Sequence, residues 1–370
     1  MLSGRYGKME HFNNVYKGKK VLVTGHTGFK GSWLSIWLNE LGAKVIGYAL
    51  SPLNSNDNFV LTQLQSKIID IRGDIRDKEQ LQQVFETYKP DMVFHLAAQP
   101  IVRTSYNYPV ETYEVNVMGT INVLECIRKC ETAKTGIFIT TDKCYENKEQ
   151  CWGYKETDSL GGYDPYSSSK AAAEIAVSSW RQSFMNPRNY NKHGKAIATV
   201  RAGNVIGGGD WSKDRIIPDC IRAIESDIPI CIRSPKAIRP WQHVLEPLSG
   251  YLKLGEKMSM NPIEYNEPWN FGPNLESIVS VWDIASSIIN AYGKGQLVDI
   301  SISQNEQFHE TNTLNLEISK AKFKLGWKPK LSVEEAICYT VEWYKKYKTD
   351  DIYKLCVEQI NRYSNIENQQ

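Results

Sequence analysis

Short apolar runs alternate with longer amphipathic segments along the first half of the chain. The apolar runs predict buried strands at residues 20–24, 44–48, 68–71, 91–96, 136–140 and 196–200. The segments between them carry apolar residues on one face and predict helices over residues 32–41, 80–88, 110–129 and 166–184. Strands that alternate with helices favour an α/β fold, with a doubly wound parallel sheet covered on both faces.

The pattern becomes less regular beyond residue 201, and this change predicts a second, smaller lobe. Residues 207–209 are consecutive glycines and residues 234–240 contain two prolines, so both segments have the composition of loops. Helical patterns return at residues 215–225, 245–256, 282–292 and 332–347. We expect the following division of the chain: an N-terminal extension at 1–16, a sheet domain at 17–203 plus about 243–272, a C-terminal lobe at 204–242 and 273–360, and a polar tail at 361–370.

The composition narrows the possible partners. The chain has 370 residues, of which 41% are hydrophobic and 23% charged, close to the globular average. A net charge of +2 gives no reason to expect nucleic acid or an acidic membrane as a partner. We find no apolar run long enough to span a bilayer and no apolar core of a signal peptide near the N-terminus. We therefore expect a cytoplasmic protein.

The cysteines and histidines show no pattern of disulfides or metal ligands. The eight cysteines contain no C-x-x-C pair, and the six histidines lack metal-ligand spacing. Without a secretion signal, scattered cysteines favour free thiols in a reducing compartment. The sequence therefore predicts no metal site.

Three glycines lie between the first predicted strand and the first predicted helix. Gly25 would permit the tight turn, Gly28 the approach of backbone to a pyrophosphate, and Gly31 close packing of helix on strand. Thr27, Phe29 and Lys30 complete this loop, and the helix N-terminus would offer free N–H groups to the phosphates. The alternative is an ordinary glycine-rich turn. In this position the loop predicts dinucleotide binding, while residues 48–51 leave NAD and NADP both open because they contain neither an acid nor an arginine.

Two further strand ends supply candidate cofactor contacts. Asp74 and Ile75 follow the third predicted strand, where the Asp74 carboxylate could accept from the adenine amine; its alternative role is a helix cap. The fourth strand ends in small residues that would let a flat cofactor ring pass close to the backbone, or would instead serve tight helix–sheet packing. These residues are Leu96, Ala97, Ala98 and Gln99.

Tyr166 and Lys170 are four residues apart on a predicted helix, so they share one face. A lysine ammonium and an oxidised nicotinamide ring would stabilise the phenolate and move the tyrosine pKa from about 10 towards neutrality. Such a tyrosine can take a proton from an alcohol during hydride transfer. This spacing also occurs on solvated helix faces, but here Pro165 precedes the tyrosine and the glycine loop lies upstream.

Thr141, Asp142 and Lys143 follow the fifth predicted strand. Ligands of open α/β sheets bind beyond the carboxyl ends of the strands, so we expect these side chains to face the same crevice as Tyr166. The alternative is a local ion pair or turn. Alcohol oxidation needs only the tyrosine, so a second acid/base pair suggests a further proton-transfer step such as loss of water.

Six motifs occur in a fixed order along the chain: the glycine loop, residues 141–143, Tyr166-x-x-x-Lys170, and the segments 201–211, 214–218 and 239–247. Together they resemble the CDP-glucose 4,6-dehydratases, a branch of the extended short-chain dehydrogenase/reductase superfamily. The resemblance runs from about residue 17 to residue 347. It implies a Rossmann-type domain that binds NAD, a nucleotide-sugar substrate, and a homo-oligomer (dimer or tetramer). Relatives acting on dTDP or GDP sugars usually carry Asp-Glu where this chain has Asp142-Lys143.

The resemblance implies conversion of CDP-glucose to CDP-4-keto-6-deoxyglucose, a precursor of deoxysugars for O-antigen-type polysaccharide. Tyr166 removes the proton of the 4-hydroxyl, which Thr141 holds, while carbon 4 gives a hydride to NAD. Lys143 is the candidate that removes the carbon 5 proton, and Asp142 is the candidate that protonates the leaving 6-hydroxyl. The hydride then returns to carbon 6. Asp142 must carry a proton and Lys143 must be neutral when they act, so we hypothesise that the two do not pair directly.

A nucleoside diphosphate is anionic, so the second lobe should present cations and amides. Arg239 is the predicted phosphate clamp, because a guanidinium matches phosphate oxygens bidentately. Asn204 and Arg215 are predicted to assist by their positions in the motifs. The alternative for each arginine is a surface salt bridge.

Other functions share parts of this pattern. A sugar-nucleotide 4-epimerase uses the glycine loop and the Tyr-x-x-x-Lys pair but needs no acid/base pair at residues 142–143. A dinucleotide-binding sensor without catalysis would have no reason to keep both pairs. A dehydratase acting on another nucleotide sugar also stays open, because the residues do not show how cytosine is distinguished from other bases.

Overall fold

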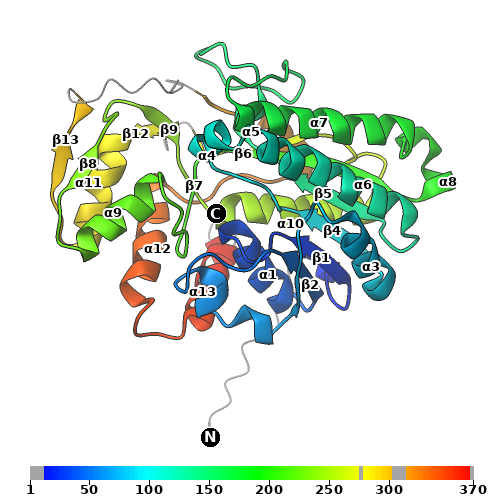
Figure 1. Ribbon diagram of the computed structural model, residues 1–370, viewed down its shortest axis with the longest axis horizontal. Coiled ribbons are helices and arrows are strands. Elements are labelled where there is room, and N and C mark those ends of the chain that lie inside the picture. The colour runs from blue at the N-terminus through cyan, green and yellow to red at the C-terminus, as the bar shows by residue number, and fades with distance from the viewer. Residues whose placement is uncertain (1–11, 275–277, 302–313, 367–370) are drawn as a thin grey trace, which may run out of the picture.

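The structure is a computed structural model that describes residues 12–274, 278–301 and 314–366 (Figure 1). Its centre is a seven-stranded sheet in which all neighbouring strands run parallel. The strands, in spatial order, are β11 (Trp269–Phe271), β6 (Ala196–Ala202), β5 (Thr135–Ile139), β4 (Met92–His95), β1 (Lys20–Thr24), β2 (Lys44–Ala49) and β3 (Ile69–Arg72). The predicted α/β fold with a doubly wound parallel sheet is confirmed.

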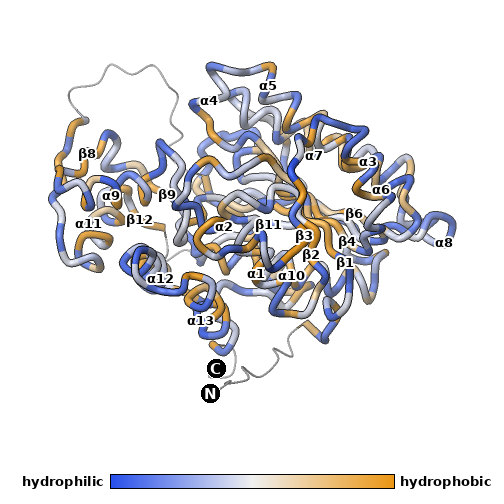
Figure 2. The backbone as a smooth tube through the Cα atoms, turned by 60° about the horizontal axis from the view of Figure 1, so that its bottom comes forward, coloured by the Kyte–Doolittle hydropathy of each residue, from blue (hydrophilic) through white to orange (hydrophobic). Residues whose placement is uncertain are grey.

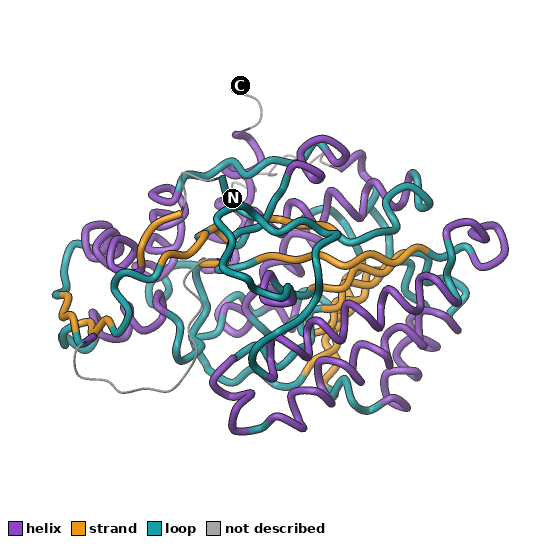
Figure 3. The backbone as a smooth tube through the Cα atoms, turned by 90° about the horizontal axis from the view of Figure 1, so that it is seen from above, coloured by secondary structure: helices purple, strands orange, loops and turns teal. Residues whose placement is uncertain are grey.

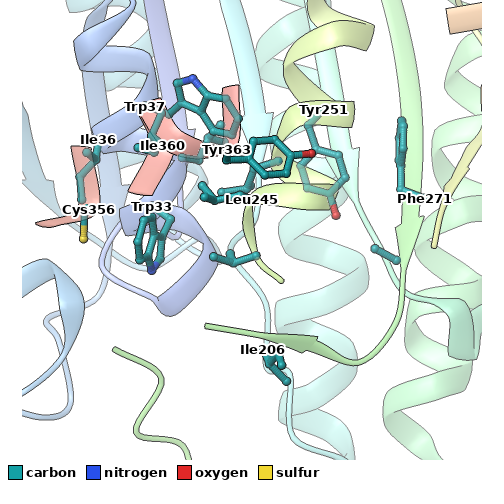
Figure 4. Packing of buried hydrophobic residues seen from close by; sticks show 14 of the residues in the cluster. Trp33, Ile36, Trp37, Ile206, Leu245, Tyr251, Phe271, Cys356, Ile360 and Tyr363 are labelled. Carbon is teal, nitrogen blue, oxygen red and sulfur yellow. The ribbon is translucent and has the colours of Figure 1, made fainter. Parts of the chain in front are cut away.

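Successive side chains of each central strand enter two different cores, which is why these strands read as continuous apolar runs. In β1, Val21 and Val23 join the larger core on one face of the sheet, and Leu22 joins the smaller core on the other. The larger core is covered by α1 (Phe29–Glu40), α10 (Leu245–Met260) and α13 (Ile352–Asn365), whose side chains meet in Figure 4. The smaller core is covered by α3 (Lys78–Tyr88), α6 (Gly119–Lys129) and α7 (Pro165–Ser183). The apolar strands thus lie between two helical layers (Figure 2, Figure 3).

The second lobe lies beside the carboxyl ends of the strands, at the left of Figure 1. It contains two short two-stranded sheets, each formed by segments that are distant in the sequence. One pairs β8 (Ile230–Ile232) with β13 (Leu297–Asp299), and the other pairs β9 (Ile238–Pro240) with β12 (Ile278–Ser280). Its helices are α9 (Ile216–Glu225), α11 (Val281–Tyr292) and α12 (Val333–Lys346).

Short elements connect these parts. They are α2 (Asn58–Leu61), α4 (Val102–Asn107), α5 (Pro109–Tyr113), α8 (Tyr190–His193), and the strand pair β7 (Val205–Ile206) and β10 (Gln242–His243). Within the described ranges, no helix combines the length and the apolar character needed to cross a bilayer.

The glycine run at residues 207–209 carries the chain from the sheet to the second lobe through a very narrow gap. The Trp33 indole N–H of α1 donates to the Gly208 carbonyl at 2.9 Å. A Cβ atom on Gly208 would lie 2.0 Å from Cγ of Trp343, and one on Gly209 would lie 2.4 Å from Cβ of Asn58. Only residues without side chains fit between these groups.

The sequence prediction missed several elements, among them β11 and α13. The seventh strand, β11, has only three residues, too few for a detectable pattern. The helix α13 was assigned partly to the second lobe and, from residue 361, to a polar tail. It continues to Asn365, buries Tyr363 and packs on α1. The predicted domain boundaries stay predictions.

The last residues of the predicted N-terminal extension pack against the rest of the protein. Its residues 1–11 lie outside the described residues, but Phe12 packs edge-on against Tyr16 and Trp37. The Tyr16 side chain is buried, and its hydroxyl donates to the Leu252 carbonyl of α10 at 2.6 Å. Phe12 and Tyr16 thus contact the helices α1 and α10, which cover the larger core.

The helix predicted over residues 110–129 is interrupted by a π-helical turn at Glu114–Met118, between α5 and α6. The turn contains Asn116, which is buried. Its amide accepts from the Gln99 N–H at 2.9 Å and donates to the Gln99 carbonyl at 3.1 Å. The irregular turn thus ties this helix to the segment that follows β4.

We predict that Gly209→Ala destabilises the protein more than Gly293→Ala. Both glycines have positive φ, +81° and +92°, so alanine costs each roughly 1 kcal/mol of backbone strain. A Cβ at Gly293 would meet no atom within 4 Å, whereas at Gly209 it would overlap Asn58. This overlap should cost a further ~1–3 kcal/mol. Denaturant midpoints measure the difference, and equal midpoint shifts for the two variants would contradict it.

Candidate active site

A cavity of about 1300 Å³ opens between the sheet and the second lobe. It is lined by residues that directly follow six strands of the sheet: Gly25, Leu50, Gly73, Leu96, Thr140 and Gly203. The carboxyl ends of parallel strands meet at one edge, so segments distant in sequence converge there. The volume exceeds that of a pocket for one drug-sized ligand.

The glycine loop forms one wall of this cavity. Gly25 has φ +75°, and a Cβ on it would lie 2.7 Å from the Ala97 nitrogen. A Cβ on Gly31 would lie 2.1 Å from the Gly25 carbonyl oxygen, so Gly31 lets α1 begin directly against the loop. Gly28 is exposed at the N-cap of α1 and lines the cavity. The first N–H groups of α1 therefore lie beside the cavity, where they suit an anion.

Thr27, Phe29 and Lys30 also line this wall. The Thr27 hydroxyl donates to the Leu50 carbonyl at 3.0 Å and fixes the loop to the end of β2. The pKa of Lys30 is lowered to about 8, first by burial and then by the charge of Arg215, while Asp142 opposes the shift. The Lys30 ammonium is thus within electrostatic reach of residues that come from the opposite side of the cavity.

The other predicted cofactor residues divide into two groups. Asp74, Ile75, Leu96, Ala97 and Ala98 line the cavity. Asp74 does not cap the following helix, because that role belongs to Asp77, which accepts from the Gln80 N–H. Hydrogen bonds from Arg76 lower the pKa of Asp74.

Gln99 differs from these residues, and its role as a cofactor contact stays a prediction. It does not line the cavity within the described part of the chain. Its side-chain amide donates to the Thr112 hydroxyl at 2.9 Å and accepts from the Ile101 N–H at 2.6 Å. Gln99 also bonds to Asn116. It thus connects the end of β4 to α5 and to the π turn.

The segment after β5 forms a short 3-10 turn, Asp142–Cys144, on the cavity wall. The Thr141 hydroxyl donates to the Asp142 carboxylate at 2.9 Å, and the Asp142 side chain is buried. A Cβ on Gly203 would lie 1.8 Å from Oδ2 of Asp142, so only glycine at the end of β6 leaves room for this carboxylate. Among the described residues, no ion pair joins Lys143 to Asp142, in agreement with the hypothesis that they do not pair directly.

Tyr166 and Lys170 lie on the first turns of α7 and are both buried. Asp164 caps this helix by accepting from the Ser167 N–H, and Pro165 occupies its first position. Burial raises the pKa of Tyr166 to about 12, while a side-chain hydrogen bond with Thr141 opposes the shift. Burial lowers the pKa of Lys170 to about 8, while the Glu174 carboxylate opposes it.

The side chain of Lys170 bonds to the backbone at the end of β5. The Lys170 ammonium donates to the Ile139 carbonyl at 3.2 Å, at the end of β5. The groups that lower the pKa of Tyr166 are Thr141 and Arg215 rather than Lys170, and burial outweighs them. The stabilisation of the phenolate by Lys170 together with an oxidised nicotinamide ring stays a prediction.

Asn204, Arg215 and Arg239 all line the cavity from the second lobe. Arg215 forms an ion pair with Asp210 at 2.7 Å, and this charge raises its pKa. The Arg239 guanidinium donates to the Ile238 carbonyl at 2.9 Å. Both arginines border the cavity, so each can contact a ligand there in addition to its protein partners.

The sequence prediction missed an ion-pair bridge across the cavity. The Asp214 carboxylate lies 3.3 Å from the Arg103 guanidinium of α4 and 3.6 Å from the Arg233 guanidinium of the second lobe. All three residues line the cavity. Arg103 and Asp214 are far apart in the chain, so no local pattern indicates that they meet.

The family model for GDP-mannose 4,6 dehydratase matches residues 22–340. The CDP-glucose 4,6-dehydratase of Salmonella typhimurium is 47% identical over 345 residues, covering 93% of this chain and 95% of that protein. The human dTDP-D-glucose 4,6-dehydratase is 28% identical over 344 residues, covering 89% of this chain and 90% of that protein.

Solved structures share the fold. The dTDP-glucose 4,6-dehydratase of Bacillus anthracis, in complex with NAD, superposes with a TM-score of 0.72 at 22% identity, covering 92% of this chain and 100% of that one. The UDP-glucose 4-epimerase of Thermotoga maritima, with UDP-glucose, gives 0.72 at 24% identity, covering 88% and 99%.

We predict that Lys170→Met changes how stability depends on pH. The folded pKa of Lys170 is about 8, below its ordinary 10.5, so the unfolded chain binds more protons between these values. The buried charge therefore lowers the free energy of unfolding below pH 8, and this cost disappears as the pH rises towards 10.5. Across this window the wild type should gain roughly 3 kcal/mol relative to Lys170→Met.

Urea unfolding at a series of pH values measures this difference. Lys129→Met, at an exposed position of α6, controls for the loss of one positive charge. A difference between wild type and Lys170→Met that stays constant with pH would refute the assignment of a buried, weakly basic amine.

Proposed function

The chain belongs to the GDP-mannose 4,6-dehydratase family, and from this premise we propose that it is an NAD-dependent CDP-glucose 4,6-dehydratase. The observation that carries the proposal is the meeting of two acid/base pairs on one cavity wall. Tyr166 and Lys170 come from α7, and Asp142 and Lys143 from the end of β5. The relative at 47% identity, a CDP-glucose 4,6-dehydratase, supports CDP-glucose over other nucleotide sugars.

The glycine loop and the strand ends beside it fit a dinucleotide. The contacts of Gly25 and Gly31 keep the loop flat against α1, so backbone N–H groups can reach a pyrophosphate. Asp74, Ile75 and the segment 96–98 would border the adenosine and the flat ring, with Lys30 near the phosphates. When bound, NAD supplies a hydride acceptor that is regenerated within each catalytic cycle.

The oxidation half of the reaction uses α7. Tyr166 takes the proton of the sugar 4-hydroxyl, and the Thr141 hydroxyl orients that group. The burial that raises the pKa of Tyr166 to about 12 also excludes water, so the phenolate needs nearby positive charge when it forms. Arg215 supplies part of that charge, and Lys170 remains close by on the next helical turn.

The elimination half uses the turn after β5. The ketone at carbon 4 acidifies the proton on carbon 5, which Lys143 removes. Asp142, held by the Thr141 hydroxyl, protonates the departing 6-hydroxyl, and water leaves. No ion pair in the described part of the chain joins Lys143 to Asp142, so each side chain can act on a different atom of the sugar.

The second lobe provides the cations for the substrate diphosphate. We assign Arg239 and Arg215 to the phosphates and Asn204 to a neighbouring polar group. Asp210 holds the Arg215 guanidinium in place, which lowers the cost of ordering it on binding.

We further propose a cytoplasmic homo-oligomer, dimer or tetramer. In support, the helices at the outer surface expose apolar side chains that a second copy would cover. Val110 of α5, Met118 of the π turn and Ile175 of α7 are all more than half exposed, at 70%, 51% and 58%.

Incubation of the NAD-loaded enzyme with CDP-glucose tests the function. A 4,6-dehydratase gives the alkaline absorbance of a 4-keto-6-deoxy sugar, a 4-epimerase gives CDP-galactose, and a sensor gives neither product. Parallel incubations with dTDP-, UDP- and GDP-linked sugars test the base preference. Faster turnover of any of these than of CDP-glucose would overturn the proposed substrate.

We predict that Lys143→Met separates the two halves of the reaction. The variant should still oxidise CDP-glucose, because Tyr166 is intact, but should fail to exchange the carbon 5 proton with solvent deuterium. Loss of a general base lowers the overall rate by about 10²–10⁴-fold. Reduced-cofactor absorbance reports the first half, and NMR of the sugar reports the second. Lys155→Met, at an exposed position outside the cavity lining, is the control. Full dehydration by Lys143→Met would remove Lys143 as the base.

A further inference from the structure

A buried ion pair lies directly behind the candidate active site. The Arg201 guanidinium of β6 contacts the Glu174 carboxylate of α7 at 2.8 Å, and each side chain is only 3% exposed. Burying two charges is costly, and a hydrophobic pair of similar volume often gives equal stability. Neither residue lines the cavity within the described part of the chain, so the pair would not touch a ligand.

Glu174 lies on α7, the helix that also carries Tyr166 and Lys170, which we call the oxidation pair. It follows Lys170 by one turn and Tyr166 by two turns, so the three residues share one face of α7. Its carboxylate accepts from the Thr140 hydroxyl at 2.5 Å and from the Thr199 hydroxyl at 2.7 Å. Thr140 immediately precedes the turn that carries Asp142, so Glu174 holds the start of that turn.

Arg201 holds the other end of the same segment. Its guanidinium donates to the Tyr145 hydroxyl at 2.6 Å and lies 4.8 Å from the centre of the Tyr145 ring. The Tyr145 hydroxyl in turn donates to Asn270 of β11 at 2.8 Å. Tyr145 comes two residues after Lys143, just past the 3-10 turn.

We propose that Glu174 and Arg201 are positioning residues for the elimination half of the reaction, an inference that rests on the proposed function. The pair fixes both ends of the segment 140–145, and thereby sets where Asp142 and Lys143 stand relative to Tyr166. Among the groups of the oxidation half, only Thr141 lies in the clamped segment, whereas Tyr166 and Lys170 lie on α7 itself, so oxidation depends less on this clamp. Loosening the clamp should therefore slow the loss of water much more than hydride transfer.

The test measures the two halves separately in Tyr145→Phe, Arg201→Lys and Glu174→Gln. Tyr145→Phe removes one hydroxyl and leaves the buried ion pair intact, so it should fold even if the charge variants do not. Single-turnover absorbance of reduced cofactor reports oxidation of CDP-glucose. Deuterium exchange at carbon 5 and formation of the 6-deoxy sugar report elimination.

A displacement of about 1 Å costs on the order of 100-fold in rate, so elimination should fall by about that factor while oxidation stays within about threefold. The KM for CDP-glucose should be unchanged, and reduced cofactor should accumulate.

Glu246→Gln is the matched control. Its carboxylate is also buried and also accepts three hydrogen bonds, from Lys330, Leu331 and Tyr363, but lies outside the cavity lining. The control should lose stability without altering the ratio of the two rates.

Equal slowing of both halves, or an unchanged ratio in Tyr145→Phe, would overturn the positioning role while leaving the dehydratase assignment intact. A wild-type enzyme that makes no 4-keto-6-deoxy sugar from CDP-glucose would instead overturn the proposed function itself. The variants therefore test the positioning role, and the wild-type enzyme tests the proposed function.

Discussion

The hydrogen bonds of the Glu174 carboxylate connect the helix α7 to the ends of two neighbouring strands, and the geometry of the candidate site depends on this junction. One carboxylate accepts from Thr140 after β5 and from Thr199 and Arg201 of β6. These bonds compensate the desolvation of a charge that would otherwise be strongly destabilising. They also hold the start of the turn after β5 against α7, the helix that carries Tyr166 and Lys170.

Close backbone contacts provide the second constraint. Glycines occur where two segments approach more closely than any side chain allows: Gly31 against Gly25, Gly203 against Asp142, and Gly208 against Trp343. The first contact flattens the loop that would receive a dinucleotide, and the second makes room for a buried carboxylate. The third lets the chain cross from the sheet to the second lobe. The glycine loop, the turn after β5 and the entry to the second lobe thus depend on the same kind of contact.

The electrostatics of the cavity follow from burial. Burial raises the pKa of Tyr166 to about 12 and lowers the pKa of Lys30 and Lys170 to about 8. Each shift favours the neutral form of the side chain, the direction expected when water is excluded. Arginines from the second lobe supply positive charge to the same space, some of it balanced by Asp210 and Asp214. An anionic ligand with several oxygens complements this arrangement.

The sequence by itself determined the six central strands, the glycine loop, the helix with Tyr166 and Lys170, and the turn with Asp142. These features are local: side-chain periodicity, a glycine at a turn and residues four apart on a helix are all read within a short window. Because parallel strands end at one edge, strand order alone also placed these residues around one crevice.

The tertiary structure decided what depends on distant segments meeting. It brought β11 to the edge of the sheet, packed α13 on α1, bonded the Gln99 side chain to Thr112 of α5, and paired Arg201 with Glu174 and Arg103 with Asp214. Such contacts join residues that are far apart in the sequence. A pattern within a short window of the sequence therefore cannot predict them.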